Sequence, residues 1–255
     1  MTNNLDALLF CLQSQGESVL EVEQAILHET ISEHNWLYPD NPIAEILIHS
    51  SDTFSCPDGA MLIPVGSIEF VEQCLTQWYG VNKCLSRLYI PEVLRSFANR
   101  WYGIADSKEQ VKDIAKTFIG GVFLKSASKV KCDYAGIYHT SDTLPDDTAY
   151  FVSEVVDIRS EWRVFVYRGK IMGIQNYAGD FWKMPDKEDV CHMVQAFTDA
   201  PNAYTLDVAV LEDGTTAVIE VHNFLSCGLY GFKSAKLPQM YRDGILWELE
   251  KGVSD

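Results

Sequence analysis

Hydrophobic positions in the first hundred residues recur at helical spacing in two places, over Ile68–Leu75 and over Pro91–Trp101. Apolar side chains three and four residues apart line one face of a helix, so this spacing predicts a helix in each range. Extended patterns surround them, and no chemical motif is recognisable before residue 105. We therefore interpret residues 1–104 as a supporting lobe and expect the chemistry in residues 105–255.

A helix start is encoded just after this boundary. Ser107 is followed three residues later by Gln110, the spacing at which the two side chains can cap the first backbone N–H groups of a helix. Val111, Ile114 and Ala115 then form an apolar stripe. The pattern predicts a helix that begins near Lys108.

Beyond Gly120–Gly121 the pattern changes to short runs rich in β-branched and aromatic residues, which predict strands up to about Val221. The expected elements are a strand at Val122–Lys125, a hairpin of Trp162–Tyr167 with Lys170–Ile174 across Arg168–Gly169, a helix near Lys187–Phe197, a hairpin of Thr205–Leu211 with Thr215–Val221, and a final helix over Leu237–Lys251 opened by Pro238.

The register of the second hairpin carries the strongest chemical signal. A two-residue loop at Asp213–Gly214 pairs Glu212 with Thr215, and counting outward places Asp207 opposite Glu220. Side chains alternate along a strand. One face should therefore hold Asp207, Ala209, Leu211, Thr216, Val218, Glu220 and His222, and the other, a wholly apolar core face, Leu206, Val208, Val210, Ala217, Ile219 and Val221.

Two carboxylates opposed on a half-buried sheet repel each other unless a cation lies between them. Mg²⁺ prefers carboxylate oxygens together with water and phosphates, so Asp207 and Glu220 suit a nucleotide-bound magnesium ion. The same repulsion predicts that replacing either acid keeps or raises the stability of the metal-free fold. The alternative is that both carboxylates face solvent.

Composition narrows the class of protein. The chain has 255 residues, of which 47% are hydrophobic, enough for a large core. A formal net charge of −16 disfavours nucleic acid and anionic lipid as partners. The seven cysteines include no Cys-x-x-Cys pair, so neither a zinc site nor a disulfide framework is expected. With no long apolar run or basic leader, we expect no membrane association and a cytoplasmic location.

The segment Glu220-Val-His-Asn-Phe, followed by Ser226-Cys-Gly-Leu-Tyr-Gly and preceded by Asp207, resembles the ATP-grasp superfamily. The resemblance implies an α+β fold in which two lobes grip ATP, preceded here by a smaller N-terminal α/β lobe. It also implies that Asp207 and Glu220 bind Mg²⁺ with a nearby asparagine. The family spacing is Glu-x-Asn, whereas this chain has His222 at that position and Asn223 one residue later, so both are candidate metal ligands.

Earlier residues extend the resemblance. Lys125, Lys131 and Arg163 match the clade named for one arginine and two lysines, which implies that they contact phosphates and support catalysis. Each lysine alone could be a surface residue, and Arg163 could instead pair structurally with Glu161 or Asp157.

The run from Phe151 to Ile158 is predicted to be a strand, and it resembles the adenine hinge of the family. The resemblance implies that Val155 and Val156 contact the adenine edge. The acidic groups that it implies near the nucleotide are Glu154, Asp157 and Glu161. The alternative is an edge strand with solvated acids.

The activity that the resemblance implies is ligation. ATP phosphorylates a substrate carboxylate, and an amine on a small molecule or peptide attacks the acyl phosphate. ATP and Mg²⁺ are the expected cofactors. Two alternatives remain open: an ATP-binding regulatory protein without catalysis, and a metal-dependent phosphoesterase. Cys227 is expected to be a small buried thiol rather than a nucleophile.

Overall fold

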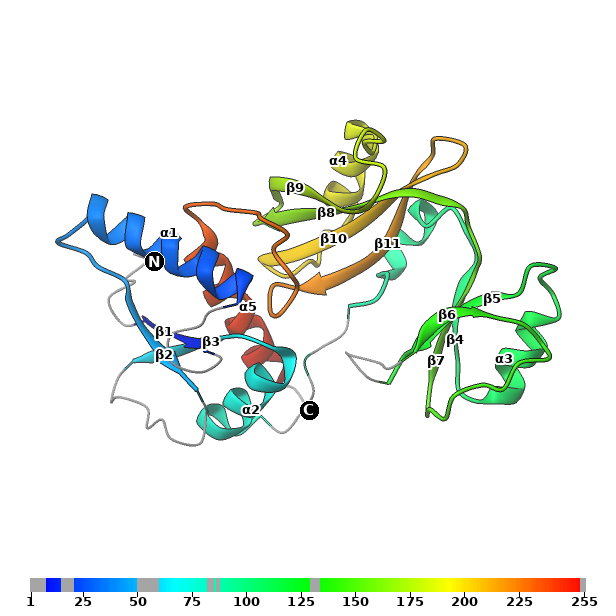
Figure 1. Ribbon diagram of the computed structural model, residues 1–255, viewed down its shortest axis with the longest axis horizontal. Coiled ribbons are helices and arrows are strands. Elements are labelled where there is room, and N and C mark those ends of the chain that lie inside the picture. The colour runs from blue at the N-terminus through cyan, green and yellow to red at the C-terminus, as the bar shows by residue number, and fades with distance from the viewer. Residues whose placement is uncertain are drawn as a thin grey trace.

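The computed structural model describes residues 8–14, 21–49, 60–81, 85, 88–128 and 134–252. Three units follow one another across the molecule (Figure 1). An N-terminal unit lies at one end, a four-stranded sheet with α4 (Lys187–Ala196) in the middle, and a smaller sheet with α3 (Lys108–Ala115) at the other end. The fold mixes helices and sheets as predicted, with 31% helix and 33% strand.

The N-terminal unit is a small parallel sheet with strand order β2-β1-β3. Its elements are β1 (Leu8–Gln13), α1 (Val22–Leu37), β2 (Ala44–Ile48), β3 (Met61–Val65) and α2 (Ile68–Tyr79). The predicted helix at Ile68 is confirmed and runs one turn further than expected. The Ser67 side chain accepts from the Phe70 N–H at its start, and Gly80, with φ of 68°, ends it in the left-handed conformation.

The second helix predicted in this half is confirmed only in part. Only a 3-10 helix, η3 (Glu92–Phe97), forms there, and Asn99 leaves helical geometry with φ of 51°. Side chains at the end of the segment bind another element instead: Asn99 Nδ2 donates to Thr216 O at 3.0 Å, and Arg100 Nη1 donates to Val218 O at 2.7 Å. Hydrophobic spacing does not register these long-range bonds to β11 (Thr216–Asn223).

The smaller sheet has strand order β4-β7-β5-β6 and is antiparallel throughout. Its strands are β4 (Tyr102–Ala105), β5 (Val122–Ser126), β6 (Ala135–Tyr138) and β7 (Tyr150–Glu154). The predicted cap of α3 is confirmed, because the Ser107 side chain accepts from the Gln110 N–H. The division of the chain after residue 104 stays a prediction, and it falls within β4.

The central sheet has strand order β11-β10-β8-β9 and is also antiparallel. Its other strands are β8 (Ile158–Tyr167), β9 (Lys170–Gly179) and β10 (Ala203–Leu211). The first hairpin has the predicted turn, since Tyr167 pairs with Lys170 and both Arg168 and Gly169 have positive φ. The helices predicted near residues 187 and 237 are confirmed as α4 and α5 (Leu237–Gly252).

The turn of the second hairpin differs from the prediction. Its loop is longer than two residues, so Glu212 does not pair with Thr215. Leu211 N instead donates to Thr215 O at 2.9 Å, and the first paired residues are Val210 and Thr216. The register next to the turn is therefore one residue away from the predicted one.

A β-bulge then corrects this shift before the strands reach the acidic residues. Val208 pairs with Val218, but Asp207 pairs with Glu220, so Ile219 is the extra residue. The predicted pairing of Asp207 with Glu220 is confirmed, although the turn used to derive it was wrong.

Between the turn and the bulge, the residues of β11 lie on faces opposite to those predicted. Val218 packs with Val208 in the core beneath the sheet, whereas Ala217 packs with Ala209 on the other face, where Ile219 is partly buried against them. The expectation that Ile219 lies in the core with Val208 is wrong, because the bulge reverses the alternation of side chains.

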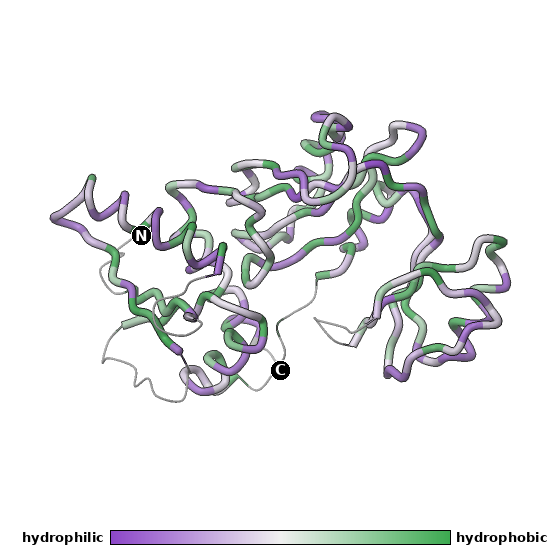
Figure 2. Tube along the Cα trace, viewed as in Figure 1, coloured by the Kyte–Doolittle hydropathy of each residue, from purple (hydrophilic) through white to green (hydrophobic). Residues whose placement is uncertain are grey.

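The N-terminal unit and the central sheet share one core. Phe10, Leu27 and Leu62 of the N-terminal unit belong to the same buried cluster as Phe165 of β8 and Phe224, which follows β11, together with residues of α5. Figure 2 shows hydrophobic stretches inside the sheets and hydrophilic ones toward the outer edge of the smaller sheet's unit. None of the helices that the structure describes is long and apolar enough to cross a membrane.

Candidate functional site

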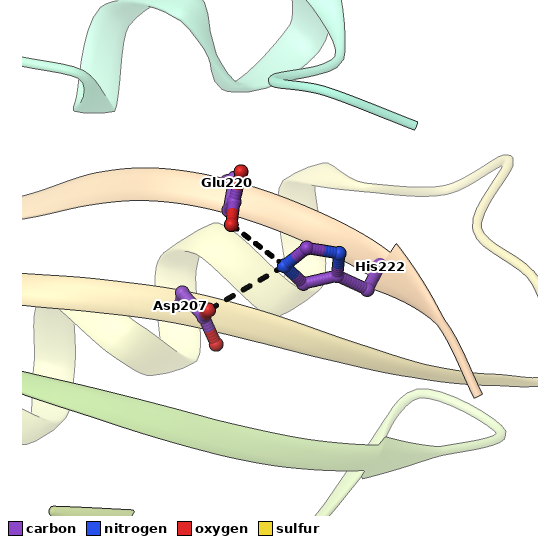
Figure 3. Close-up of side chains that lie close together, drawn as sticks. All are labelled: Asp207, Glu220 and His222. Atoms are coloured by element: carbon purple, nitrogen blue, oxygen red, sulfur yellow. Dashed lines mark hydrogen bonds and ion pairs between the residues drawn. The ribbon is translucent and has the colours of Figure 1, made fainter. Parts of the chain in front are cut away.

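Three side chains that can bind a cation converge on one face of the central sheet (Figure 3). Asp207 comes from β10, and Glu220 and His222 come from β11, two residues apart and therefore on the same face. His222 Nε2 lies 2.8 Å from Glu220 Oε1 and 3.6 Å from Asp207 Oδ2. We call these three residues the acidic cluster.

Arg163 forms a two-pronged ion pair with the deepest member of this cluster. It lies directly opposite Asp207 in the β8–β10 register. Its Nε donates to Asp207 Oδ1 at 2.8 Å and its Nη2 to Oδ2 at 2.7 Å, and the two side chains are only 7% and 2% exposed. The sequence pointed to Glu161 or Asp157 as structural partners of Arg163, but cross-strand register makes Asp207 the partner.

Lys125 reaches the cluster from the smaller sheet. Its ammonium group pairs with Glu220 Oε2, and it lies over the Phe151 ring at 5.3 Å from the ring centroid. Lys125 is therefore placed beside the acidic cluster although 95 residues separate it from Glu220. The contact links the smaller sheet to the central one.

The structure shows how two neighbouring carboxylates coexist here. Asp207 is held by Arg163, and Glu220 is held by Lys125 and His222. Three basic side chains thus offset the repulsion for which the sequence alone suggested only a metal ion. The solvent-exposed alternative is wrong for Asp207, which is 1% exposed.

The same contacts shift the titration of both β11 residues. Burial disfavours the charged form of Glu220, but the hydrogen bond and charge of His222, together with Lys125, outweigh it and hold the Glu220 pKa far below its usual range. Burial likewise opposes the charge on His222, but hydrogen bonds and charges from Asp207 and Glu220 raise its pKa to about 9. His222 is therefore an imidazolium at neutral pH.

This shift predicts a pH dependence of stability in protein treated with EDTA. A pKa raised from 6.5 to about 9 on folding stabilises the fold fully below about pH 6.5, and this contribution is lost as the pH rises through about 9. The free energy of unfolding should fall over that window by at most about 3 kcal/mol, as measured by urea denaturation. The His222→Asn variant should lack this component, and an identical pH profile in that variant would contradict the assignment.

A cavity of about 540 Å³ opens beside the acidic cluster. All three units contribute to its lining, which includes Lys125 from the smaller sheet, Arg163, Glu220 and His222 from the central sheet, and Ser67, Ile68 and Glu69 from the start of α2. A ligand in this cavity would touch basic, acidic and imidazole groups at the same time.

The loop after β11 closes one side of the cavity. Ser226 Oγ donates to Gly66 O at 2.8 Å, which ties the loop to the N-terminal unit, and Arg163 Nη1 donates to Gly228 O at 3.2 Å. Gly228 has φ of 70°, and a Cβ there would lie 3.2 Å from Arg163 Nη1. Glycine is therefore required both by the backbone conformation and by the approach of the arginine.

Two tyrosines that sequence reasoning missed cover Arg163. Tyr230 of the loop and Tyr177 of β9 stack with ring centroids 5.1 Å apart, and the Arg163 guanidinium lies 5.1 and 5.7 Å from their centroids. Tyr230 occurs in the quoted glycine-containing segment, whereas β9 carried no signal for Tyr177. Cation–π contacts of this kind favour a charged, oriented guanidinium.

The expected hinge is a connection rather than a continuous strand. β7 ends at Glu154 and β8 begins at Ile158, so the predicted strand from Phe151 to Ile158 is wrong. Residues 155–157 carry the chain from the smaller sheet to the central sheet, and the strand hydrogen bonding is interrupted over these residues.

The candidate nucleotide residues of this region lie in different surroundings. Glu154 Oε2 accepts from Trp101 N at 3.3 Å, and Val156 packs against the Ala209, Leu211 and Ala217 cluster. Val155 is partly buried and Asp157 is exposed. Glu161 shares the face of Arg163, and its Oε2 accepts from Tyr177 OH at 2.8 Å. None of residues 154–157 lines the 540 Å³ cavity.

The remaining candidates also differ in placement. Asn223 lines the cavity, but its amide donates to the buried Glu248 and is not part of the acidic cluster. Lys131 lies outside the described residues. Cys227 is buried as expected, and burial raises its thiol pKa to about 12, so it is not an activated nucleophile.

A family model described as an ATP-grasp domain, family 2 of the clade named for one arginine and two lysines, matches residues 105–240. No protein with curated annotation matches. The chain is similar to three solved structures. A RimK domain ATP-grasp protein from Sphaerobacter thermophilus has 16% identity and a TM-score of 0.57, and the match covers 95% of this chain and 99% of that one. The ATP-grasp ligase PsnB complexed with a minimal precursor has 12% identity and a TM-score of 0.56, with 95% and 99% of the two chains covered, and D-alanine–D-alanine ligase from Bacillus anthracis complexed with ATP has 13% identity and a TM-score of 0.53, with 96% and 98% covered.

Proposed function

The chain belongs to the ATP-grasp superfamily, in the clade named for one arginine and two lysines, and from this premise we propose that it is an ATP- and Mg²⁺-dependent ligase. In the proposed reaction a substrate carboxylate is activated as an acyl phosphate, which an amine then attacks to form a C–N bond. The observation that carries the proposal is that Lys125, Arg163, Glu220 and His222 line one cavity, with the buried Asp207 held beside them by Arg163.

The acidic cluster fits a divalent cation. One donor atom from each of Asp207, Glu220 and His222 lies within 4.8 Å of the others. Asp207 and Glu220 are the residues proposed to hold Mg²⁺. When bound there, the ion supplies charge neutralisation for the β- and γ-phosphates of ATP. Arg163 and Lys125 orient the two carboxylates through their ion pairs.

We assign different roles to the two basic side chains Lys125 and Arg163. Lys125 is 20% exposed and belongs to the cavity lining, so its ammonium group is available to bind a phosphate. Arg163 already donates three hydrogen bonds, two to Asp207 and one to Gly228 O. We assign it mainly to positioning the Asp207 carboxylate and the loop, with its remaining N–H groups facing the substrate side.

The adenine is proposed to bind beside residues 155–157. Val156, which is partly buried, packs there on the buried residues Ala209, Leu211 and Ala217, on the face of the central sheet that also carries the acidic cluster. The partly buried Val155 and Val156 offer apolar contact to an aromatic base, and backbone groups of this non-strand connection can pair with its edge. Glu161, on the same face, is proposed to lie toward the ribose.

The carboxylate and amine substrates are proposed to bind where the 226–231 loop and the N-terminal unit border the cavity. Tyr230 and Ser67 mark these two sides. The similar structures include an ATP-grasp ligase complexed with a minimal precursor and a ligase named for D-alanine. A peptide or small-molecule acceptor is therefore the substrate class that we propose.

The first test measures nucleotide binding and turnover together. ATP with Mg²⁺ at ~100 times its dissociation constant should stabilise the fold by roughly 2.7 kcal/mol and raise the thermal midpoint. ADP release should then appear when mixtures of candidate carboxylates and amines are added. No thermal shift at millimolar ATP would contradict the proposal, and a shift without ADP release on any mixture would favour the regulatory alternative.

The Lys125→Ala variant is expected to bind ATP more weakly. The substitution removes a charge-assisted phosphate contact worth roughly 1.5–3 kcal/mol, which corresponds to a loss of about 10- to 150-fold in affinity. Isothermal titration calorimetry measures this change. Lys116→Ala is the matched control, because Lys116 is exposed and pairs with Asp113 three residues away. Equal affinities in both variants would remove Lys125 from the nucleotide site.

A further inference from the structure

The acidic cluster contains an imidazole as well as carboxylates, and this changes the ion that it should prefer. We propose that Asp207, Glu220 and His222 form a mixed oxygen and nitrogen site that binds Mn²⁺ more tightly than Mg²⁺, with His222 Nε2 as a direct ligand. The inference deepens the proposed function by naming the metal of its site. It rests on that function only for the role of the ion with ATP.

The spacing of the three donors suits one ion. Ligands at right angles around a cation with bonds of about 2.1–2.2 Å lie about 3 Å apart. His222 Nε2 is 2.8 Å from Glu220 Oε1 and 3.6 Å from Asp207 Oδ2. All three donor atoms lie within 4.8 Å of one another, so inward movement of the two carboxylates would bring them into one first coordination shell with the imidazole. Figure 3 shows both carboxylates beside the same imidazole nitrogen.

The surrounding residues hold the donors in this arrangement. Arg163 holds Asp207 through two hydrogen bonds, and Lys125 takes Glu220 Oε2 while Oε1 faces the imidazole. Such contacts reduce the freedom of ligands and typically matter about 10- to 100-fold for metal affinity. Glu220 and His222 both line the cavity, from which phosphate or water oxygens can complete the coordination.

Ligand chemistry then selects the ion. Mg²⁺ is a hard cation that demands oxygen ligands in near-ideal octahedral geometry, and an imidazole nitrogen is a poor member of such a set. First-row divalent ions accept nitrogen and carboxylate oxygen together. Mn²⁺ is the member of that series closest to Mg²⁺ in its use of carboxylate, phosphate and water. It is therefore the ion that best suits a site with two carboxylates and one imidazole nitrogen. Binding replaces the proton on Nε2 by the metal, and the proton leaves to solvent.

The experiment measures metal binding directly, without substrates. Calorimetry with Mn²⁺ or Mg²⁺ alone should give an affinity at least ~10-fold higher for Mn²⁺. Pulsed electron paramagnetic resonance of the Mn²⁺ complex should show coupling to a ¹⁴N nucleus, and protein labelled with ¹⁵N-histidine should show ¹⁵N coupling instead. A Mn²⁺ complex without histidine nitrogen coupling, or equal affinities for the two ions, would overturn the proposal.

The His222→Asn variant assigns the nitrogen to one residue. It replaces the imidazole by the amide oxygen donor that the family places there, so the nitrogen coupling should disappear and the preference for Mn²⁺ should shrink ~10-fold or more. His192 is an exposed residue of α4, so His192→Asn is the matched control and should keep both the nitrogen coupling and the preference for Mn²⁺. Nitrogen coupling retained in His222→Asn would overturn the assignment.

The experiments distinguish failure of the ligase proposal from failure of the manganese proposal. ATP turnover with no nitrogen coupling would leave the ligase and remove the manganese site. Nitrogen coupling with no ATP binding would leave the metal site and remove the ligase. If His222→Asn does not fold, as judged by circular dichroism, the labelled wild-type protein still decides whether a histidine nitrogen binds the ion.

Discussion

Replacing Asp207 by alanine is expected to lower the free energy of unfolding by about 3–5 kcal/mol and to abolish ATP-dependent turnover. Asp207 and Arg163 form a buried, two-pronged ion pair, so removal of the carboxylate leaves the guanidinium buried without its charge partner. This reverses the expectation from sequence, in which relief of repulsion between Asp207 and Glu220 keeps or raises stability. Urea denaturation in EDTA measures the loss.

A double variant separates the expected loss of stability from the expected loss of turnover. Arg163→Met combined with Asp207→Leu replaces the ion pair by apolar side chains, and such replacement of a buried pair is often neutral or stabilising. The double variant should therefore recover most of the stability lost in Asp207→Ala while remaining inactive. If Asp207→Ala is as stable as the wild-type protein, the ion pair does not contribute as the structure indicates.

Replacing Glu220 by glutamine is expected to lower turnover by roughly three orders of magnitude while lowering the free energy of unfolding less than Asp207→Ala does. The Glu220 side chain is 24% exposed and its partner Lys125 is 20% exposed, so their ion pair contributes about 1 kcal/mol. The substitution also removes the Glu220 charge beside the His222 imidazolium, and with it part of the stabilisation that His222 provides below about pH 9. Glu220 is, however, a proposed ligand of the ion whose charge the transition state needs, and that contribution is worth several kcal/mol. Steady-state kinetics and thermal unfolding measure the two quantities.

The same hairpin offers a matched control for Glu220→Gln. Glu212 lies at its turn, where its exposed carboxylate pairs with Arg159, and both side chains are more than half exposed. Glu212→Gln should keep turnover within about twofold of wild type. Equal turnover in the two variants would show that Glu220 serves structure rather than catalysis.

Local sequence pattern predicted some elements of the fold correctly and others wrongly. The cap at Ser107, the Arg168–Gly169 turn and the helix at Lys187 depend on contacts within a few residues, and all three are confirmed. The strand through residues 155–157 was wrong because the chain changes sheets there. The helix predicted over Pro91–Trp101 is only a 3-10 helix that ends at Phe97, and Asn99 and Arg100 beyond it bind carbonyl groups of a strand more than a hundred residues away.

The pairing of Asp207 with Glu220 shows most clearly how far strand register can be predicted from hydrophobic pattern. Alternating hydrophobicity and a glycine turn place the two acids on adjacent strands, because a strand exposes one face and buries the other. Hydrophobicity cannot reveal a loop with an extra residue and a compensating bulge at Ile219, since both faces of β11 near the turn carry small or apolar residues. The predicted pair was therefore right, whereas the predicted faces beyond it were wrong.

By itself, the amino-acid sequence determined the elements with strong local signals, the acidic residues of the second hairpin and the resemblance to the ATP-grasp superfamily. Only the tertiary structure decided which charges meet. Arg163 pairs with Asp207 because β8 and β10 are neighbours in the sheet, and Lys125 reaches Glu220 because the smaller sheet lies beside the central one. These contacts join residues 44 and 95 positions apart, and their energies depend on burial and distance, which the order of residues does not specify.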